Sequence, residues 1–297
     1  MKTLFLSIVL LLGCIFTTTA GWSYAQQEQD IKQWVNCLVS EKYQGREIGT
    51  EGGYLAAEYV ASCLTDMGYK PDFQEFVTET HGTGHNIIAK LDGQYNDSLI
   101  ILGAHYDALG TKDGKIYYGA DDNATGTAVL LSLAKRFKES GETPKYSIVF
   151  IAWDGEEQRL LGSKHFVENI GDIHKVKFYM NFDMIGRSEG LDSATACFAW
   201  NDNFPHLKSD FESLYEQTKN DQEITIDVVY EPRRGNGSGG SDYAPFSKYN
   251  VPFIAWMEHH LHEDYHQPTD TVDKLEWKKM NDVSVLSYKI VCSLAMP

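Results

Sequence analysis

Short, strongly apolar segments alternate with segments of helical spacing along most of this 297-residue chain. Residues 98–104, 146–153, 176–182 and 251–256 are largely apolar at consecutive positions, as in strands that are buried on both faces. Parallel strands need a long crossover connection, and an α-helix usually supplies it. The sequence therefore predicts an α/β fold with three layers: a mixed, mostly parallel central sheet with helices on both faces.

Further elements are expected around these four strands. Additional strands are predicted at 73–77, 86–91, 194–200 and 224–230, and helices at 30–41, 53–67, 124–138, 160–168, 205–218 and 280–294. The chain shows no internal repeat and no Pro-rich or Ser-rich linker. We therefore expect residues 26–297 to form a single domain.

The first residues are typical of an export signal. The apolar run from Leu4 to Phe16 is short for a membrane span, and Ser23-Tyr24-Ala25 has the small-x-small pattern of a cleavage site. Residues 1–25 are therefore predicted to be a signal peptide. The mature protein would be periplasmic or extracellular, with no membrane span. Two alternatives stay open: an uncleaved membrane anchor, and a lipoprotein anchored through Cys14.

Charge and cysteine usage narrow the classes of function. The formal net charge is −16 at pH 7, which argues against nucleic acid or an anionic membrane as a partner. Four cysteines follow the predicted cleavage point, without any Cys-x-x-Cys or zinc-finger spacing: Cys37, Cys63, Cys197 and Cys292. We expect them to be small buried apolar residues, with one disulfide as the alternative in an oxidising compartment.

Acidic residues and histidines stand directly after three of the predicted strands. In chain order these residues are His105, Glu156, Glu157 and Asp183. The carboxyl ends of parallel neighbouring strands meet at one edge of a sheet, where open α/β folds bind their ligands. We therefore expect these four side chains to share one crevice.

Two further motifs add metal-binding chemistry. In His105-Tyr106-Asp107, the histidine can bind a metal through one ring nitrogen while the carboxylate holds the other. Asp121-Asp122-Asn123 precedes a predicted helix, so these residues either cap that helix or provide a carboxylate shared by two cations.

The remaining motifs also have alternatives. Glu156 and Glu157 could open a helix in solvent, but adjacent glutamates after a buried strand repel each other and are costly to desolvate. One of them could bind metal while the other accepts a proton. Four histidines lie within residues 259–266. We expect one ligand among them, His266, with the others in the pocket wall or solvated.

Six motifs between Gly103 and Thr271 resemble, in order, those of the two-zinc exopeptidase family. This family includes secreted bacterial aminopeptidases, glutamate carboxypeptidase and glutaminyl cyclase. The motifs are GAHYDALG, GADDNATG, AWDGEEQRLLGS, MNFDMIGR, GGSDYAPF and HEDYHQPTDT. Residues 45–60 also resemble the family's N-terminal helical region.

The resemblance implies a role for each matching residue. Glu156 would be the general base, and Asp107 would contact His105 without binding zinc itself. The implied zinc ligands are His105, Asp122, Glu157, Asp183 and His266, with Asp122 shared by two zinc ions. Asp242 and Tyr243 are candidates for contact with the ligands or the substrate, although relatives commonly have histidine where this chain has Tyr243.

The resemblance implies a secreted aminopeptidase that carries two Zn²⁺ per chain and hydrolyses the N-terminal peptide bond of a substrate with a free amine. One alternative is acyl transfer of the glutaminyl cyclase type, and another is a carboxypeptidase or dipeptidase of the same family. A third, from a different class, is a non-catalytic binding domain, which would be expected to have lost ligands or the base.

Overall fold

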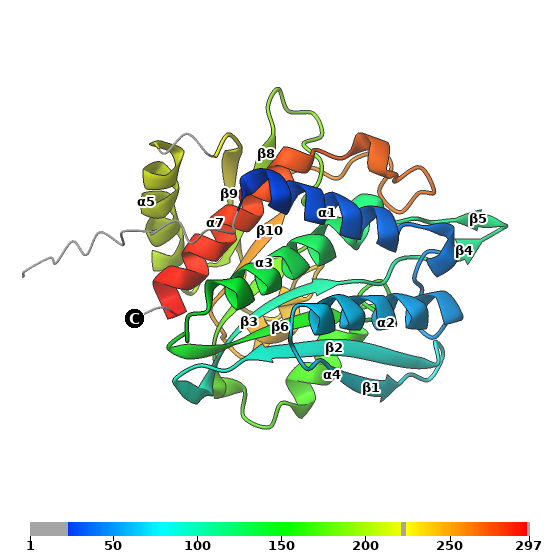
Figure 1. Ribbon diagram of the computed structural model, residues 1–297, viewed down its shortest axis with the longest axis horizontal. Helices are drawn as coiled ribbons and strands as arrows, with labels where there is room; N and C mark the ends of the chain where they lie inside the picture. Colours follow the sequence, from blue (N-terminus) through cyan, green and yellow to red (C-terminus); the bar gives the residue numbers. More distant parts are fainter. Residues whose placement is uncertain (1–22, 221–223, 296–297) are drawn as a thin grey trace, which may run out of the picture.

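A sheet of eight strands, in the order β1-β2-β6-β3-β7-β10-β8-β9, runs through the computed structural model of the chain (Figure 1). The structure describes residues 23–220 and 224–295. The strands are β1 (Asp72–Val77), β2 (Thr83–Leu91), β3 (Tyr95–His105), β6 (Tyr146–Trp153), β7 (Val176–Phe182), β8 (Thr195–Asn201), β9 (Asp227–Arg233) and β10 (Phe253–Met257). A separate hairpin is formed by β4 (Thr111–Lys112) and β5 (Lys115–Ile116).

The middle of the sheet is parallel and its flanks are mixed. β3 pairs in parallel with β6 and β7, and β10 pairs in parallel with β7. The pairs β1–β2, β2–β6 and β8–β10 are antiparallel, whereas β8 and β9 are parallel to each other. The predicted mixed, mostly parallel sheet is therefore confirmed.

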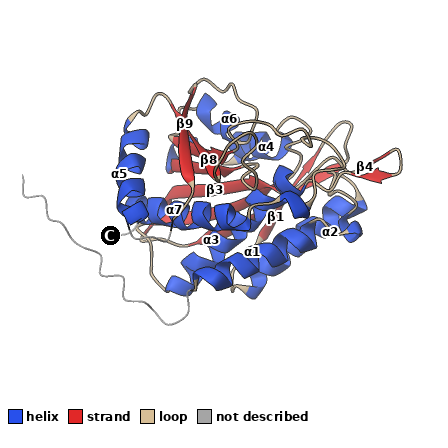
Figure 2. Cartoon of the chain, turned by 90° about the horizontal axis from the view of Figure 1, so that it is seen from above, coloured by secondary structure: helices blue, strands red, loops and turns tan. Residues whose placement is uncertain are grey.

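Helices cover both faces of this sheet (Figure 2). One face carries α1 (Tyr24–Leu38), α2 (Glu51–Asp66), α3 (Gly126–Ser140), α5 (His206–Asn220) and α7 (Trp277–Ala295), and the other carries α4 (Leu161–Asn169) and α6 (Tyr243–Lys248). Short helical turns occupy Glu41–Tyr43, Ala120–Thr125, Ile173–Lys175 and Val272–Lys274. Each face has its own apolar core, because the buried strand side chains alternate between the two faces.

Several element boundaries differ from the prediction. α1 begins at Tyr24 rather than near Asp30, because Ser23 caps it by accepting a hydrogen bond from the Gln26 backbone N–H and Tyr24 hydrogen-bonds to Asp282 of α7. β9 starts three residues later than the predicted 224–230, at Asp227. The short helix α6 lacked the length for a periodic signal and was not predicted.

The structure bears only in part on the predictions of a signal peptide and of buried cysteines. Most of the predicted signal peptide and Cys14 lie outside the described residues, and its last residues form the start of α1. None of the helices described is long and apolar enough to cross a membrane. No disulfide links the four cysteines within the described ranges, and Cys63 and Cys197 are buried.

The side chain of Arg46 is fully buried and joins three segments that surround the crevice. Its guanidinium donates to the carbonyl oxygens of Leu38 (2.9 Å), Tyr106 (2.7 Å), Tyr118 (2.7 Å) and Gly119 (2.9 Å). Burial lowers the pKa of Arg46 to about 10, and nearby Asp107 and Asp270 oppose that shift, so it stays charged at neutral pH. Arg46 therefore ties the end of α1 to the loops that follow β3 and precede Asp122.

Replacing Arg46 should destabilise the fold. Arg46→Met leaves buried carbonyl groups without donors, so we expect the free energy of unfolding to fall by roughly 3 kcal/mol or more, as measured by urea unfolding. Arg234→Met removes an exposed arginine and should change it by less than about 0.5 kcal/mol. Equal effects of the two substitutions would show that Arg46 is not a structural anchor.

Candidate active site

The predicted crevice forms where β3, β6 and β7 end. His105 stands opposite Trp153 of β6, and Gly103 stands opposite Asn181 of β7, so the three strands finish at one level. The loops after them deliver Glu156, Glu157 and Asp183 to the same place. The juxtaposition predicted from the strand ends is confirmed.

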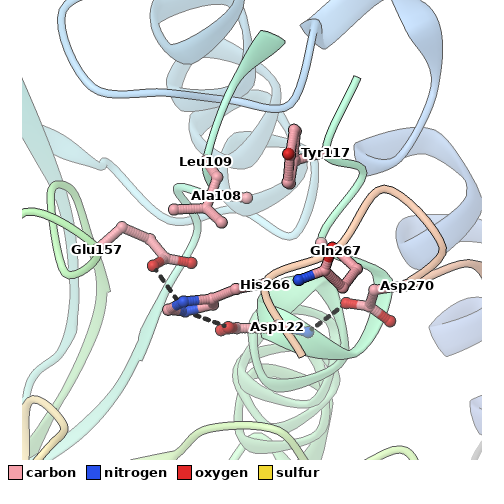
Figure 3. A pocket seen from close by; sticks show the side chains of 9 residues that line it. Ala108, Leu109, Tyr117, Asp122, Glu157, His266, Gln267 and Asp270 are labelled. Carbon is pink, nitrogen blue, oxygen red and sulfur yellow. Dashed lines mark hydrogen bonds and ion pairs between the residues drawn. The ribbon is translucent and has the colours of Figure 1, made fainter. Parts of the chain in front are cut away.

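Asp122 lies between the two predicted histidine ligands. Its Oδ1 is 3.4 Å from Nε2 of His105, and its Oδ2 is 3.3 Å from Nε2 of His266. His105 Nε2 is also 3.3 Å from Oδ1 of Asp183, and His266 Nε2 is 3.1 Å from Oε2 of Glu157. Figure 3 shows His266 between Glu157 and Asp122. The Asp122 carboxylate therefore faces two imidazole–carboxylate pairs, His105 with Asp183 and His266 with Glu157.

The charges of these groups are strongly linked. Burial alone would raise the pKa of Asp122, but hydrogen bonds from His105 and His266 bring it below its ordinary value. Hydrogen bonds to Asp122 and Glu157 raise the pKa of His266 to about 10. Burial would lower the pKa of His105, but Glu156 and Asp183 raise it well above its ordinary value. The surrounding carboxylates thus favour the protonated, positively charged form of both imidazoles.

The turn that carries Glu156 and Glu157 is held by Asp107. The backbone N–H groups of Glu156 and Glu157 donate to its two carboxylate oxygens, over 3.1 and 3.2 Å. His105 Nδ1 lies 3.3 Å from the Asp107 carbonyl oxygen and 3.5 Å from its carboxylate, which leaves Nε2 facing Asp122. Because α4 begins only at Leu161 and the Glu157 side chain is 3% exposed, the alternative of a solvated helix start is wrong.

The two adjacent glutamates have different neighbours. Burial raises the pKa of Glu156 well above its ordinary value; His105 opposes the shift, and Asp183 and Asp242 add to it. Burial and Asp122 raise the pKa of Glu157 to about 7. Glu156 therefore borders the pair formed by His105 and Asp183, whereas Glu157 contacts His266.

Asn123 and Asp270 hold the loop that carries Asp122, and neither was singled out from the sequence as a site residue. Asp270 accepts hydrogen bonds from the backbone N–H groups of Asp121 and Asp122, over 3.0 and 3.1 Å. Asn123 accepts from the N–H groups of Gly126 and Met184 and donates to the Phe182 carbonyl, which joins the loop to the end of β7.

The capping alternative for Asp121 and Asp122 is wrong. Neither carboxylate caps α3, and only the Asn123 side chain accepts from the first N–H of that helix. Pro268-Thr269-Asp270-Thr271 is typical of a structured turn, but the sequence alone gave no sign that Asp270 reaches back to the Asp121–Asp122 loop.

The other histidines of residues 259–266 do not join the Asp122 cluster. Nδ1 of His259 is 2.7 Å from Oε1 of Glu231, and the His260 ring lies against the His259 ring at a tilt of 44°. His262 is buried, 3.3 Å from Oδ2 of Asp121, in a separate group with Glu258. Of these four histidines only His266 lies in the crevice with Asp122, and His262 is enclosed in the protein rather than solvated. That His266 is the metal ligand of this segment stays a prediction.

Asp242 and Tyr243 lie beside the crevice. Asp242 is buried, which raises its pKa to about 7 against the opposing effect of His105. Tyr243 stacks on Phe253 with ring centroids 4.7 Å apart, within the apolar core beneath α6. Contact of Tyr243 with a substrate oxyanion stays a prediction.

The donor set suits zinc. Imidazole nitrogens and carboxylate oxygens are ordinary zinc ligands. The donor atoms of His105, Glu156 and Asp183, and likewise those of Asp122, Glu157 and His266, lie within 4.8 Å of one another. Oε1 of Glu157 has no hydrogen-bond partner among the described residues. Four buried or partly buried carboxylates thus face two imidazoles, and cations bound here would offset their mutual repulsion.

Comparison with known sequences identifies the family. The profile of peptidase family M28 matches residues 86–291. The chain belongs to peptidase family M28. The M28 match contains every proposed ligand and Glu156, and it confirms the family expected from the six motifs.

Relatives within the M28 family are longer proteins. Leupeptin-inactivating enzyme 1 of Streptomyces exfoliatus is 30% identical over 220 residues, which cover 73% of this chain and 45% of that protein. Leucine aminopeptidase 2 of Arthroderma otae is 34% identical over 179 residues, which cover 57% of this chain and 32% of that protein. The chain thus spans less than half the length of these relatives.

Solved structures share the M28 fold at low sequence identity. The aminopeptidase LapA of Legionella pneumophila has a TM-score of 0.78 and 22% identity, and the match covers 92% of this chain and 74% of that one. A zinc aminopeptidase from Bacillus subtilis has a TM-score of 0.74 and 15% identity over 93% and 96% of the two chains. A glutaminyl cyclase from Macrostomum lignano has a TM-score of 0.75 and 18% identity over 91% of each chain. These likenesses show a common fold.

The hydrogen bonds of Asp107 generate a prediction about metal binding. Asp107→Asn replaces one acceptor oxygen with a donor facing a backbone N–H, so the turn and the His105 ring should lose their fixed orientation. We expect zinc affinity to fall about ten- to a hundredfold in competition with a chromophoric chelator. Asp113→Asn, in the exposed β4–β5 hairpin, is the control and should leave zinc affinity unchanged. Unaltered affinity in Asp107→Asn would remove this positioning role.

Proposed function

We propose that this chain is an exported, zinc-dependent aminopeptidase that binds two zinc ions and releases the N-terminal residue of a peptide. The observation that carries the proposal is the position of Asp122, whose two carboxylate oxygens face His105 and His266 at 3.4 and 3.3 Å. A carboxylate placed in this way suits a bridge between two metal ions, which in such sites lie about 3.5–4 Å apart. Export rests on the apolar run and cleavage pattern near the N-terminus.

The remaining ligands divide into two sets in this proposal. His105 and Asp183, which lie 3.3 Å apart, would hold one zinc ion, and Glu157 and His266, 3.1 Å apart, would hold the other. When bound, the zinc ions supply Lewis-acid chemistry, which polarises a carbonyl group and lowers the pKa of water toward neutrality. Ligation by the neutral imidazoles requires both histidines to lose their extra proton, so zinc binding and proton release should be linked.

Glu156 acts as the general base in the proposed mechanism. Its carboxylate lies beside His105 and Asp183 but is separate from the His266–Glu157 pair. It accepts a proton from the attacking water and returns that proton to the leaving amine. Burial and the neighbouring carboxylates raise its proton affinity, and bound cations would lower that affinity again. The Asp107 carboxylate keeps the turn in place through the Glu156 N–H.

The charge of the crevice supports an amino-terminal direction of cleavage. Asp183, Glu156 and Asp242 are carboxylates around one end of the site, and a positively charged α-amine would be attracted there. Relatives named leucine aminopeptidase and a solved aminopeptidase with the same fold agree with this direction.

A second candidate is acyl transfer of the glutaminyl cyclase type, because a glutaminyl cyclase shares the fold with a TM-score of 0.75. The presence of His105 favours the peptidase, since it provides a second imidazole–carboxylate pair on Asp122. Cyclisation of glutaminyl peptides with no release of N-terminal residues would favour the cyclase.

The assignment of the base generates one prediction. Glu156→Gln removes the proton acceptor and keeps the shape of the side chain. We expect zinc content to persist and turnover of leucine 4-nitroanilide to fall at least about a hundredfold. Glu142→Gln, at an exposed position after α3, is the control and should keep full activity. Turnover near that of the unaltered protein would exclude Glu156 as the base, and loss of zinc would make it a ligand.

The requirement for a free α-amine and the dependence of activity on metal can be measured together. A panel of amino-acid 4-nitroanilides should be hydrolysed only when the α-amine is free, because N-acetylation removes the positive charge that the acidic crevice attracts. A strong chelator should abolish turnover, and zinc should restore it. Hydrolysis of N-blocked substrates at equal rates, or activity that resists complete zinc removal, would contradict the proposal.

A further inference from the structure

A broad groove leads away from the Glu156–Glu157 turn across the surface of the protein. Its volume is about 740 Å³, and its walls are the β1–β2 turn, the segment that follows Glu157, and α4. Glu157 also borders the small recess in Figure 3, whose volume is about 10 Å³, near what one water molecule needs. The groove is therefore the wider of the two spaces that border Glu157.

This difference in size matters for the proposed aminopeptidase, on which the inference rests. An aminopeptidase encloses the N-terminal residue, whereas the rest of the peptide must leave the site through an opening. The groove meets this need because it starts at a proposed zinc ligand and opens to solvent. Val77, which is 85% exposed, offers the peptide an apolar surface there.

Arg159 is a cationic residue of this groove and stands close to the Glu156–Glu157 turn in the chain. It follows Glu157 by two residues, and two residues of chain span at most about 7 Å. Its side chain is exposed and lines the groove. The guanidinium has no ion-pair or hydrogen-bond partner in the part of the chain that the structure describes. In a protein with 42 acidic and 26 basic residues, an arginine without a carboxylate partner beside the site is distinctive.

The backbone fixes Arg159 in an unusual conformation. Its φ angle is 73°, and that of Leu160 is 63°, in the left-handed region that most residues with a side chain avoid. The turn is closed by hydrogen bonds from Leu160 N–H to the Glu156 carbonyl (2.8 Å) and from Leu161 N–H to the Gly155 carbonyl (2.9 Å). Strained residues of this kind are concentrated at functional sites. The turn thus fixes the backbone of Arg159 relative to that of Glu156.

Lys164 is the other permanent cation of the groove, but its ammonium already donates to the Arg159 carbonyl over 2.7 Å. Glu79 and Glu168 also line the groove, so net charge alone would not attract an anion. A guanidinium presents two parallel N–H groups that match the two oxygens of a carboxylate. The local chemistry therefore favours a carboxylate at Arg159.

We infer that Arg159 binds a carboxylate on the first residue after the scissile bond. The carboxylate is the C-terminus of a dipeptide or the side chain of an acidic residue at that position. The protein would then prefer dipeptides, or peptides with an acidic second residue, over otherwise equal substrates that lack this charge.

The test uses the zinc-loaded full chain and the variant Arg159→Asn, because asparagine tolerates the left-handed conformation. Four substrates are compared: leucyl-alanine, leucyl-alanine amide, the α-amide of leucyl-glutamate, and leucine 4-nitroanilide. We expect KM to rise about tenfold or more for leucyl-alanine, for the leucyl-glutamate amide or for both, as a charged hydrogen bond is lost. KM for the two uncharged substrates should stay within about twofold of the unaltered protein, given that they make no such bond.

Lys164→Gln is the matched control, since it removes the same charge from the same groove. Its KM for the charged substrates should change far less than that of Arg159→Asn. An equal rise in both variants, or an equal rise for charged and uncharged substrates, would overturn the role of Arg159.

A binding measurement separates this inference from the proposed peptidase activity. The Glu156→Gln protein, with and without Arg159→Asn, can be titrated with leucyl-alanine and with its amide in a calorimeter. Tighter binding of the free acid that depends on Arg159 supports the inference even without turnover. Equal binding of acid and amide to the Glu156→Gln protein would contradict it.

Discussion

Four carboxylates, those of Asp122, Glu156, Glu157 and Asp183, crowd into the crevice at the ends of β3, β6 and β7, where the two aspartates are buried and the two glutamates are partly buried. Burial raises the pKa of both glutamates above its ordinary value, and repulsion by neighbouring carboxylates adds to the shift. Two histidines face them, but two imidazoles do not balance four carboxylates. The rest of the site is arranged around this excess of negative charge, which suits the binding of cations.

Further acidic residues hold the ligand loops by accepting hydrogen bonds from backbone N–H groups. Asp107 binds the N–H groups of the Glu156–Glu157 turn, and Asp270 binds those of the Asp121–Asp122 loop. Arg46 provides the opposite contact, because its guanidinium donates to carbonyl oxygens of the neighbouring loops. Backbone N–H and carbonyl groups of these loops are therefore hydrogen-bonded to side chains that are not proposed ligands. The ligand side chains stay free to face one another.

The sequence predicted the parts of this site that depend on local order. A charged residue directly after a buried strand lies at the strand's carboxyl end, so His105 and Asp183 could be placed from the apolar runs alone. Asp270 and Arg46 could not, because each acts through contacts with segments about 60 to 150 residues away in the chain. Asn123 was visible beside Asp122, but its hydrogen bonds to both β7 and α3 depend on how the loop closes. Boundaries moved where capping and side-chain contacts decided them, as at the start of α1.

Asp122 is proposed as the ligand that two zinc ions share. Anomalous diffraction at the zinc edge from crystals of the zinc-loaded protein tests this proposal directly. We expect two peaks about 3.5–4 Å apart, one near His105 and Asp183 and the other near Glu157 and His266, with Asp122 between them. A single peak bound by only one histidine, or zinc bound away from Asp122, would contradict it.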